Sequence, residues 1–566
     1  MSLTFLLAAL GVQAQDPLAP LPQPAPPPAQ ERQVVAPPAY QLPEPTAPNV
    51  LGAIAQKRWD IARALVDRMD RRDPMESYVR AELYLAAGSP EVSAAELVSL
   101  IERGRDLPQA AQLARLAQRR GAGPQPVAAQ QPIVSLGSAP RRVRARPVDD
   151  PGTEEVRTAI RPYIEADDPE PAEAIYRDAR DRLSRDALAE IAQKVAFIYY
   201  VVGRDQDARR IAADGRANGS GEWAARASYL EGLAAWRAGD CDGASSAFRW
   251  AALATGNREI AAGGHYWSAR AEQACRRPHQ VAARMRAAAE DVETFYGQVA
   301  RLTLGMDRRP PERVEAPRPD HIRRVEDLPN VRRAIAFAGI GYRGHAEDLL
   351  KHQARIGSPE DHRALLEIAK RHSLAGAQYW LATNGPRGAK TDVADRYPAP
   401  SWNPENGWRI DPYMAYAHII QESDFREWVV SPADAVGLMQ VRPGTARDTA
   451  RRRGQTVSVD MLKRAETNID HGQEFIALTR SDRYFQDQLP RIIAAYNAGP
   501  VPVRRWNGIR DNGDPLLWME SLPYWETRGY VPAVLRNYFV YHALAGNEPS
   551  ALKGLAEHRW PTYPTR

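Results

Sequence analysis

Apolar residues recur three and four positions apart along most of this chain, which is the spacing of one face of an amphipathic helix. Residues 77–88 are an example, in which Tyr, Val, Ala and Leu recur at that interval among charged residues. The same spacing in residues 51–121 predicts short helical hairpins, and it resumes at residue 156 and continues to residue 390. We therefore expect a mainly α-helical protein.

Turn residues interrupt the second helical stretch at a regular interval. Gly203, Gly239 and Cys275 each follow an apolar helical run, about 35 residues apart, which is close to the period of tetratricopeptide-type helical hairpins. Such repeats stack on their neighbours and form a solenoid. The sequence therefore predicts an α-superhelical repeat domain over residues 156–390.

The two cysteines of the chain, Cys241 and Cys275, occupy the same phase of successive repeats. Stacking would bring their turns into neighbouring positions, and an oxidising compartment would allow them to pair. We predict a Cys241–Cys275 disulfide if the protein is exported. Two small buried thiols are the alternative, because sequence does not establish the close approach that a disulfide needs.

The N-terminal region has the pattern of an exported protein. Residues 1–14 resemble a signal peptide, since a short apolar run ends in small residues and cannot span a bilayer. We expect no stable membrane insertion after processing. Residues 15–50 are expected to be a linker, with twelve prolines between Asp16 and Asn49, and residues 122–155 a second, flexible linker.

Composition excludes several classes of protein. The chain has 566 residues, 44% hydrophobic and 26% charged, as in an ordinary globular protein with more than one folded unit. Its formal charge of +5 is spread along the chain, whereas a nucleic-acid reader would show a concentrated basic stripe. No cluster has convincing metal-ligand spacing, and there is no Gly-rich phosphate loop. We expect no metal, no cofactor and no nucleic-acid partner.

One carboxylic acid stands at the end of an apolar helix. Asp411 fits the helix cap and Pro412 the first helical position, and apolar residues carry the helix inward to Glu422. Desolvation there would favour the protonated form of Glu422, and the helix dipole would act in the same direction. A protonated carboxyl is what general acid catalysis on a glycosidic oxygen requires. From composition alone, an exposed surface glutamate is the simpler interpretation.

Two further segments supply groups for a cleft around Glu422 and favour the catalytic interpretation. Residues 437–440, Gly-Leu-Met-Gln, combine a Gly that allows close approach of a ligand with a polarizable side chain and an amide. Residues 494–500, Ala-Ala-Tyr-Asn-Ala-Gly-Pro, add a phenol, a second amide and a helix stop. Together they are typical of a sugar-cleaving enzyme.

Four blocks in this order resemble the soluble lytic transglycosylases, whose catalytic domain is similar to goose-type lysozyme. The blocks are Glu422-Ser423 with Ser431, residues 437–440, residues 494–500, and residues 520–531. The resemblance implies an α-helical lysozyme-like domain over residues 397–560, preceded by an α-superhelix of the ring-like kind found in that family.

The resemblance also implies roles for individual residues. Glu422 would be the sole catalytic acid and base, and the substrate-binding residues would be Ser431, Met439, Gln440, Tyr496, Asn497, Glu526 and Tyr530. Asp434 stands where the family often has Gly, and Arg442 where an apolar residue is frequent. His418, one turn before Glu422, could pair with it, although a place on another part of the helix is the simpler interpretation.

The reaction implied by the resemblance is cleavage of peptidoglycan between N-acetylmuramic acid and N-acetylglucosamine. Glu422 would protonate the linking oxygen and then act as base while the muramoyl 6-hydroxyl closes on C1, giving a 1,6-anhydro end without water. Ordinary glycosidases need a second carboxylate at a defined separation. Asp424 would point to a different side if the helix continues beyond Glu422.

Two alternatives stay open. A hydrolytic muramidase would use the same glutamate with water as the nucleophile, and a non-catalytic scaffold would bind cell-wall polymer through the helical repeats. The expected partners are peptidoglycan glycan strands and, through the repeats, proteins of cell-wall synthesis. We expect a periplasmic monomer.

Overall fold

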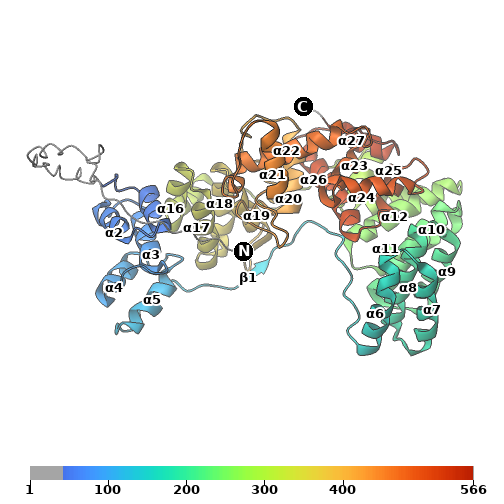
Figure 1. Ribbon diagram of the computed structural model, residues 1–566, viewed down its shortest axis with the longest axis horizontal. Coiled ribbons are helices and arrows are strands. Elements are labelled where there is room, and N and C mark those ends of the chain that lie inside the picture. The colour runs from blue at the N-terminus through green and yellow to red at the C-terminus, as the bar shows by residue number, and fades with distance from the viewer. Residues whose placement is uncertain (1–41, 565–566) are drawn as a thin grey trace, which may run out of the picture.

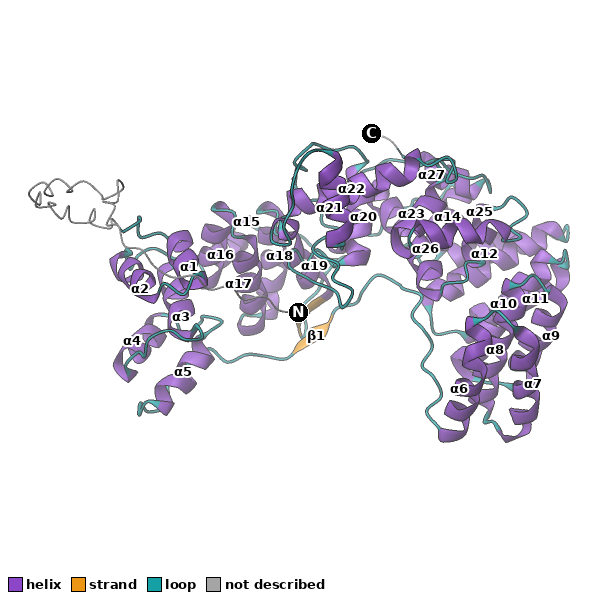
Figure 2. Cartoon of the chain, in the orientation of Figure 1, coloured by secondary structure: helices purple, strands orange, loops and turns teal. Residues whose placement is uncertain are grey.

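The computed structural model describes residues 42–564. The predicted signal peptide and most of the proline-rich linker lie outside the described residues, and helix α1 already begins at Ala47, inside the range expected to be linker. Between residues 42 and 564 helices make up nearly all of the regular structure (Figure 2). The sheet found there pairs β1 (Ile133–Ser135) with β2 (Asn384–Pro386) in antiparallel orientation. The prediction of a mainly α-helical protein is confirmed.

The helices form four consecutive groups along the chain. The first group consists of α1 (Ala47–Ala55), α2 (Trp59–Arg68), α3 (Glu76–Leu85), α4 (Ala94–Arg103) and α5 (Ala110–Arg119). The second consists of α6 (Pro151–Glu165), α7 (Pro169–Ala179), α8 (Arg185–Val201), α9 (Asp205–Asn218), α10 (Gly221–Arg237), α11 (Cys241–Ala254), α12 (Arg258–Ala274), α13 (Pro278–Ala289) and α14 (Phe295–Thr303). The third consists of α15 (Pro319–Glu326), α16 (Pro329–Gly339), α17 (Arg343–Ile356), α18 (His362–Arg371) and α19 (Ala375–Thr383). The fourth consists of α20 (Pro412–Glu422), α21 (Pro443–Arg452), α22 (Ala465–Ser481), α23 (Leu489–Ala498), α24 (Pro500–Arg505), α25 (Pro515–Glu520), α26 (Trp525–Leu544) and α27 (Ser550–Ala556).

These groups share two hydrophobic cores. One core combines the second and fourth groups with Ala375 and Tyr379 of α19, and the other combines the first and third groups, which lie side by side in Figure 1. The Tyr78 hydroxyl lies 3.0 Å from His345 Nδ1, and Arg333 donates a 2.6 Å hydrogen bond to Asp106, so polar contacts also join the first and third groups. The stretch expected to form one superhelical unit, residues 156–390, thus contributes to both cores.

The predicted repeats are the helical hairpins α8–α9, α10–α11 and α12–α13, each packed on the next. Their turns fall at the positions expected from the sequence. Gly203 and Gly239 occupy two of these turns with φ of 82° and 79°, a left-handed conformation that Gly adopts without a steric penalty.

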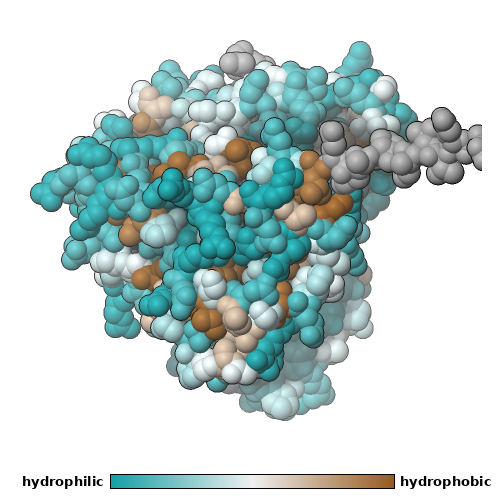
Figure 3. All heavy atoms as spheres, turned by 90° about the vertical axis from the view of Figure 1, so that its left-hand side faces the viewer, coloured by the Kyte–Doolittle hydropathy of each residue, from teal (hydrophilic) through white to brown (hydrophobic). Residues whose placement is uncertain are grey.

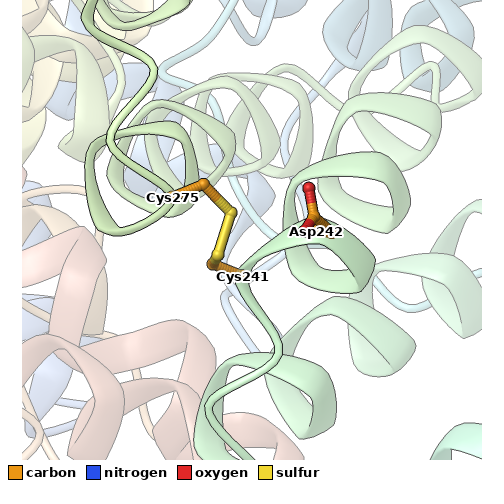
Figure 4. A group of neighbouring side chains, drawn as sticks. All are labelled: Cys241, Asp242 and Cys275. Carbon is orange, nitrogen blue, oxygen red and sulfur yellow. A yellow bond between two sulfur atoms is a disulfide. The ribbon is translucent and has the colours of Figure 1, made fainter.

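Cys241 and Cys275 are joined by a disulfide, with their Cα atoms 5.6 Å apart (Figure 4). Cys241 is the first residue of α11 and Cys275 directly follows α12, so the bond links the turns of two successive hairpins. Asp242, beside the disulfide, pairs with Arg277 and adds an ionic link between the same two repeats.

Residues 122–150, which we call the strap, differ from the flexible linker that the sequence predicted. The strap contains β1, and α6 begins at Pro151, inside the range expected to be linker. Its backbone carbonyls accept hydrogen bonds from the second helical group: Asn257 donates to Arg141 O at 2.8 Å and Trp223 donates to Arg146 O at 2.8 Å. The low-complexity composition of this segment predicted a flexible joint. The hydrogen bonds that hold it come from residues far away in the sequence, so the local composition could not indicate them.

One strap side chain enters the interior. Arg142 donates two hydrogen bonds of 2.6 Å to the Glu520 carboxylate, and both side chains are less than a tenth exposed. Glu520 also accepts from the hydroxyls of Tyr229 and Tyr296, at 3.1 and 2.7 Å. The strap, the second helical group and the fourth helical group therefore meet at one buried ion pair.

The surface formed by the end of the molecule nearest the first helical group is mostly hydrophilic, with apolar side chains in small groups (Figure 3). Within residues 42–564, none of the helices has both the length and the apolar character that crossing a membrane would require.

Candidate active site

Glu422 is the last residue of helix α20. The helix begins as predicted, since Pro412 occupies its first position and the Asp411 carboxylate accepts a 2.9 Å hydrogen bond from the Tyr413 N–H. Residues 414–420 are all buried, so α20 runs through the core of the fourth group. Its last turn brings Glu422 to the edge of that core, where the side chain is half-buried.

The environment of Glu422 suits proton transfer near neutral pH. Burial raises the pKa of the carboxyl to about 7, and the charge of Glu526 acts in the same direction. A 2.5 Å hydrogen bond from the Tyr530 hydroxyl to Glu422 Oε1 opposes this shift, because it stabilises the carboxylate. With this pKa, Glu422 can both donate and accept a proton at neutral pH, as acid and base catalysis requires.

Tyr530 of α26 also contacts His418, which lies one turn before Glu422 on α20. His418 Nδ1 is 2.8 Å from the Tyr530 hydroxyl. His418 and Glu422 are therefore connected through Tyr530, an arrangement that differs from both the direct pair and the unrelated position considered from the sequence.

The loop of residues 431–440 is tied to the end of α20 beside Glu422 and is held by hydrogen bonds to its backbone. Ser431 Oγ accepts a 3.0 Å hydrogen bond from the Ala435 N–H. Ser423 Oγ, directly after α20, donates a 2.7 Å hydrogen bond to Leu438 O. Ser431 thus shapes this loop, and its contact with substrate stays a prediction.

Met439 and Gly437 have structural surroundings that the sequence did not indicate. The Met439 side chain is fully buried against Gly472, so it packs in the core. Gly437 has a φ of 76°, and a Cβ at this position would collide with the side chain of Asn468. Gly437 is therefore required by the loop itself, whereas the sequence suggested close approach of a ligand.

Asn468 on α22 is a residue that the sequence analysis missed. Its Oδ1 accepts a 2.7 Å hydrogen bond from the Met439 N–H, and its Nδ2 donates to Val436 O at 2.8 Å. The side chain is fully buried. An amide at a buried helix position, as at Asn468 and also at Gln473 of α22, is the signal that could have identified it, because buried amides are normally hydrogen-bonded.

Tyr496 and Gln440 both donate hydrogen bonds to backbone carbonyls of this loop. The Tyr496 hydroxyl donates a 2.7 Å hydrogen bond to Met439 O, and Gln440 Nε2 donates to Gly437 O at 2.9 Å. Burial raises the pKa of Tyr496, and the nearby charge of Glu422 adds to this effect. The structure thus brings Tyr496 and Glu422 together as the sequence predicted.

Asn497 and Glu526 join helices α23 and α26. Asn497 Nδ2 donates a 3.1 Å hydrogen bond to Glu526 Oε1, and Thr527 Oγ1 donates to Asn497 Oδ1 at 2.7 Å. Glu526 is exposed, so it offers a solvated carboxylate close enough to Glu422 to influence its pKa.

Asp424 has a different position from the one inferred by continuing α20. The helix ends at Glu422, and Asp424 has a φ of 51° and pairs with Arg141 of the strap at 3.0 Å.

Asp434 has a φ of 60°, which explains why Gly suits this position and why the short Asp side chain is tolerated. Arg442 is exposed immediately before α21.

Comparison with known families matches the segment that contains these groups. Residues 402–518 match the family described as Transglycosylase SLT domain. This part of the chain is a transglycosylase SLT domain. Of the predicted site residues, the SLT domain match includes Glu422, Ser431, Met439, Gln440, Tyr496 and Asn497, while Glu526 and Tyr530 follow it on α26.

The SLT domain also carries the similarity to curated relatives. The chain is 38% identical over 153 residues to the soluble lytic murein transglycosylase of Escherichia coli (strain K12), and 37% identical over 155 residues to that of Salmonella typhimurium. Each match covers 26% of this chain and 23% of the relative. The aligned region therefore spans about a quarter of the length of these relatives.

Similarity of fold extends over nearly the whole chain. The crystal structure of the 70 kDa soluble lytic transglycosylase SLT70 from Escherichia coli aligns with a TM-score of 0.56 and 17% identity, covering 91% of this chain and 98% of that one. The complex of the 70-kDa soluble lytic transglycosylase with bulgecin A aligns with a TM-score of 0.53 and 16% identity. The predicted fold class, a helical superhelix followed by an α-helical lysozyme-like domain, is confirmed.

Proposed function

We propose that this protein is a lytic murein transglycosylase that cleaves peptidoglycan between N-acetylmuramic acid and N-acetylglucosamine. The observation that carries the proposal is the position of Glu422 in the SLT domain, at the end of a buried helix with its pKa raised to about 7. The sequence similarity to soluble lytic murein transglycosylases covers the same segment.

In the proposed reaction Glu422 serves first as acid and then as base. Its proton passes to the glycosidic oxygen as the bond from that oxygen to C1 of the muramoyl residue breaks. The resulting carboxylate, stabilised by the Tyr530 hydroxyl, takes the proton of the muramoyl 6-hydroxyl while O6 bonds to C1. The products are a free 4-hydroxyl and a 1,6-anhydro end, no water is consumed, and Glu422 returns to its protonated form.

Glu526 is a second carboxylate near Glu422, and it needs a role in the proposed reaction. A hydrolytic muramidase of the usual kind would use a second carboxylate to activate water or to attack C1. Glu526 is engaged with the Asn497 amide, and we propose that its charge acts on the pKa of Glu422 and that its carboxylate contacts substrate. We further propose Ser431, Gln440 and Tyr496 as cleft residues.

The mass of the products tests this proposal. Purified peptidoglycan digested with the protein is expected to release muropeptides that are lighter by one water than reducing muropeptides, as read by mass spectrometry. Reducing products would make the protein a muramidase. Binding to the polymer without any released product would support the scaffold alternative.

The pH dependence of the reaction follows from the acid role of Glu422. Only the protonated form starts the reaction, so kcat/KM is expected to fall about tenfold per pH unit above the pKa of about 7. Initial rates of muropeptide release between about pH 5 and pH 9 measure this limb. A rate that stays constant to about pH 9 would contradict the assignment of Glu422 as the acid.

The setting of the protein is part of the same proposal. We propose that it acts in the periplasm, where peptidoglycan lies, as a monomer whose helical repeats contact proteins of cell-wall synthesis. In this proposal residues 402–518, with Glu526 and Tyr530 of α26, supply the catalytic machinery, and the helical groups before them support it.

A further inference from the structure

His418 is a buried histidine beside the acid/base residue that the proposed reaction leaves without a role. Its side chain has no exposed surface. Its ring centroid lies 4.6 Å from that of Tyr496 and 5.9 Å from that of Tyr530. Its Nδ1 is 2.8 Å from the Tyr530 hydroxyl, and that hydroxyl is 2.5 Å from Glu422 Oε1.

The protons of this chain of contacts can be assigned from the donors available. When Glu422 is ionised its carboxylate can only accept, so Tyr530 donates its one hydroxyl proton to Glu422. The Tyr530 oxygen must then accept from His418, so the proton of the imidazole is on Nδ1. Burial lowers the pKa of His418 to about 3, so the ring is neutral and carries this single proton.

The other imidazole nitrogen shows the cost of this arrangement. His418 Nε2 is buried and has no hydrogen-bond partner in the described part of the chain. A buried polar atom without a partner is unfavourable, and an apolar residue of similar size would avoid it. The benefit that offsets this cost is the one hydrogen bond that the imidazole makes, to Tyr530.

We propose that His418 is a positioning residue that fixes the Tyr530 hydroxyl toward Glu422 and thereby sets the proton affinity of the acid. A hydroxyl that accepts a hydrogen bond becomes a better donor, because successive hydrogen bonds polarise one another. His418 thus strengthens the bond from Tyr530 to the Glu422 carboxylate. The proposal rests on the catalytic role of Glu422 given above, and it deepens that role.

Other titratable groups face the same three side chains. Glu526 of α26 raises the pKa of Glu422 by its charge, Tyr496 of α23 lies against the His418 ring, and Tyr563 in the C-terminal segment adds to the raised pKa values of Tyr496 and Tyr530. These groups are unchanged in the variants that test the proposal, so a difference between variants reports on the His418–Tyr530 contact.

The decisive variant is His418→Leu, which removes the donor and keeps an apolar side chain of similar size. Without His418, Tyr530 becomes a weaker donor, the Glu422 carboxylate loses stabilisation, and the pKa of Glu422 rises. Since the protonated form is the active one, the alkaline limb of kcat/KM is expected to move to higher pH by about half to one unit.

Two amide variants separate position from polarity. In His418→Asn the amide nitrogen can occupy the place of Nδ1 and donate to Tyr530, so the limb is expected to return toward its original pH. In His418→Gln the amide reaches the place of Nε2, and the limb is expected to stay shifted. Equal limbs for these two variants would contradict the proposed contact.

A double-variant cycle tests whether His418 acts through Tyr530. Tyr530→Phe removes the hydrogen bond to Glu422 and is expected to shift the limb by at least as much as His418→Leu. Adding His418→Leu to Tyr530→Phe is then expected to cause no further shift. An additional shift of the same size, or a His418→Leu variant that loses activity equally at every pH, would assign His418 to packing alone.

A measurement without turnover keeps this proposal separate from the proposed function. The pKa of Glu422 can be read in the full-length protein from the ¹³C chemical shift of its labelled side-chain carboxyl, with Glu422→Gln identifying the signal. A higher pKa in His418→Leu would support the contact even if digestion gave no products. An unchanged pKa would overturn it even if the transglycosylase activity were established.

Discussion

Replacing Glu422 with Gln is expected to lower the rate of muropeptide release by about 10²–10⁴-fold, the contribution typical of a general acid. Gln keeps the size of the side chain and an oxygen that can accept the hydrogen bond from Tyr530, but it carries no titratable proton. The fold around the end of α20 should therefore be preserved. Initial rates on purified peptidoglycan, with thermal unfolding to confirm the fold, measure the effect.

Glu427 provides a matched control for this variant. It is a second buried glutamate of the same loop region, and burial raises its pKa to about 7 against the opposing charge of Arg343. It pairs with Arg343 at 2.9 Å, and within residues 42–564 it has no hydrogen bond to Tyr530 or Tyr496. Glu427→Gln is expected to keep the rate within about threefold. The change weakens the buried pair with Arg343, so it lowers the free energy of unfolding and leaves the hydrogen bond from Tyr530 to Glu422 in place.

These two variants give a clear decision. A Glu422→Gln protein that still releases muropeptides at the normal rate would remove Glu422 from the reaction. Equal loss of activity in both variants, with both proteins folded, would show that a raised carboxyl pKa in this region is insufficient to identify the acid.

Replacing Arg142 with Ala is expected to lower the free energy of unfolding by about 3–5 kcal/mol, as breaking a buried ion pair does. Burial alone would raise the pKa of Glu520, but the charge of Arg142 and the hydrogen bonds to the carboxylate outweigh it and hold the pKa below its ordinary value. Without Arg142 the carboxylate keeps only the two tyrosine hydroxyls as partners. Denaturant-induced unfolding at neutral pH measures the loss.

The neighbouring Arg141 is the control for Arg142. Arg141 pairs with Asp424 at 3.0 Å, but both side chains are more than a third exposed, so Arg141→Ala is expected to cost less than about 1 kcal/mol. In a Glu520→Gln background the cost of Arg142→Ala should also become smaller, because no buried charge is left unpaired. Equal losses for the Arg141 and Arg142 variants would show that the strap is not anchored by the buried pair.

Much of the candidate site could be predicted because its local parts follow from short-range spacing. The cap at Asp411 and Pro412 and the apolar run before Glu422 indicated a helix that ends at a desolvated carboxyl, and the structure has this helix. The repeat interval indicated hairpins whose turns coincide with Gly203 and Gly239. Each of these features depends on residues within a few positions of one another or one repeat apart.

The places where the sequence analysis differed from the structure involve contacts between distant segments. Composition suggested a flexible linker at residues 122–155, yet Arg142 in this segment reaches Glu520, which is 378 residues away. Met439 was expected among the substrate-binding residues, but Gly472 of α22 lets it pack into the core. No spacing within either segment indicates its partner.

The sequence by itself determined the helical class, the repeats and the acid at the end of α20, because amphipathic spacing, caps and turn residues act over one or two helical turns. Only the tertiary structure decided that Tyr530 lies between His418 and Glu422, that Asn468 holds the loop at Met439, and that the strap is tied to the core by Arg142. These contacts depend on how helices far apart in the chain pack against one another, since burial and hydrogen-bond partners at a site are supplied by every segment that surrounds it.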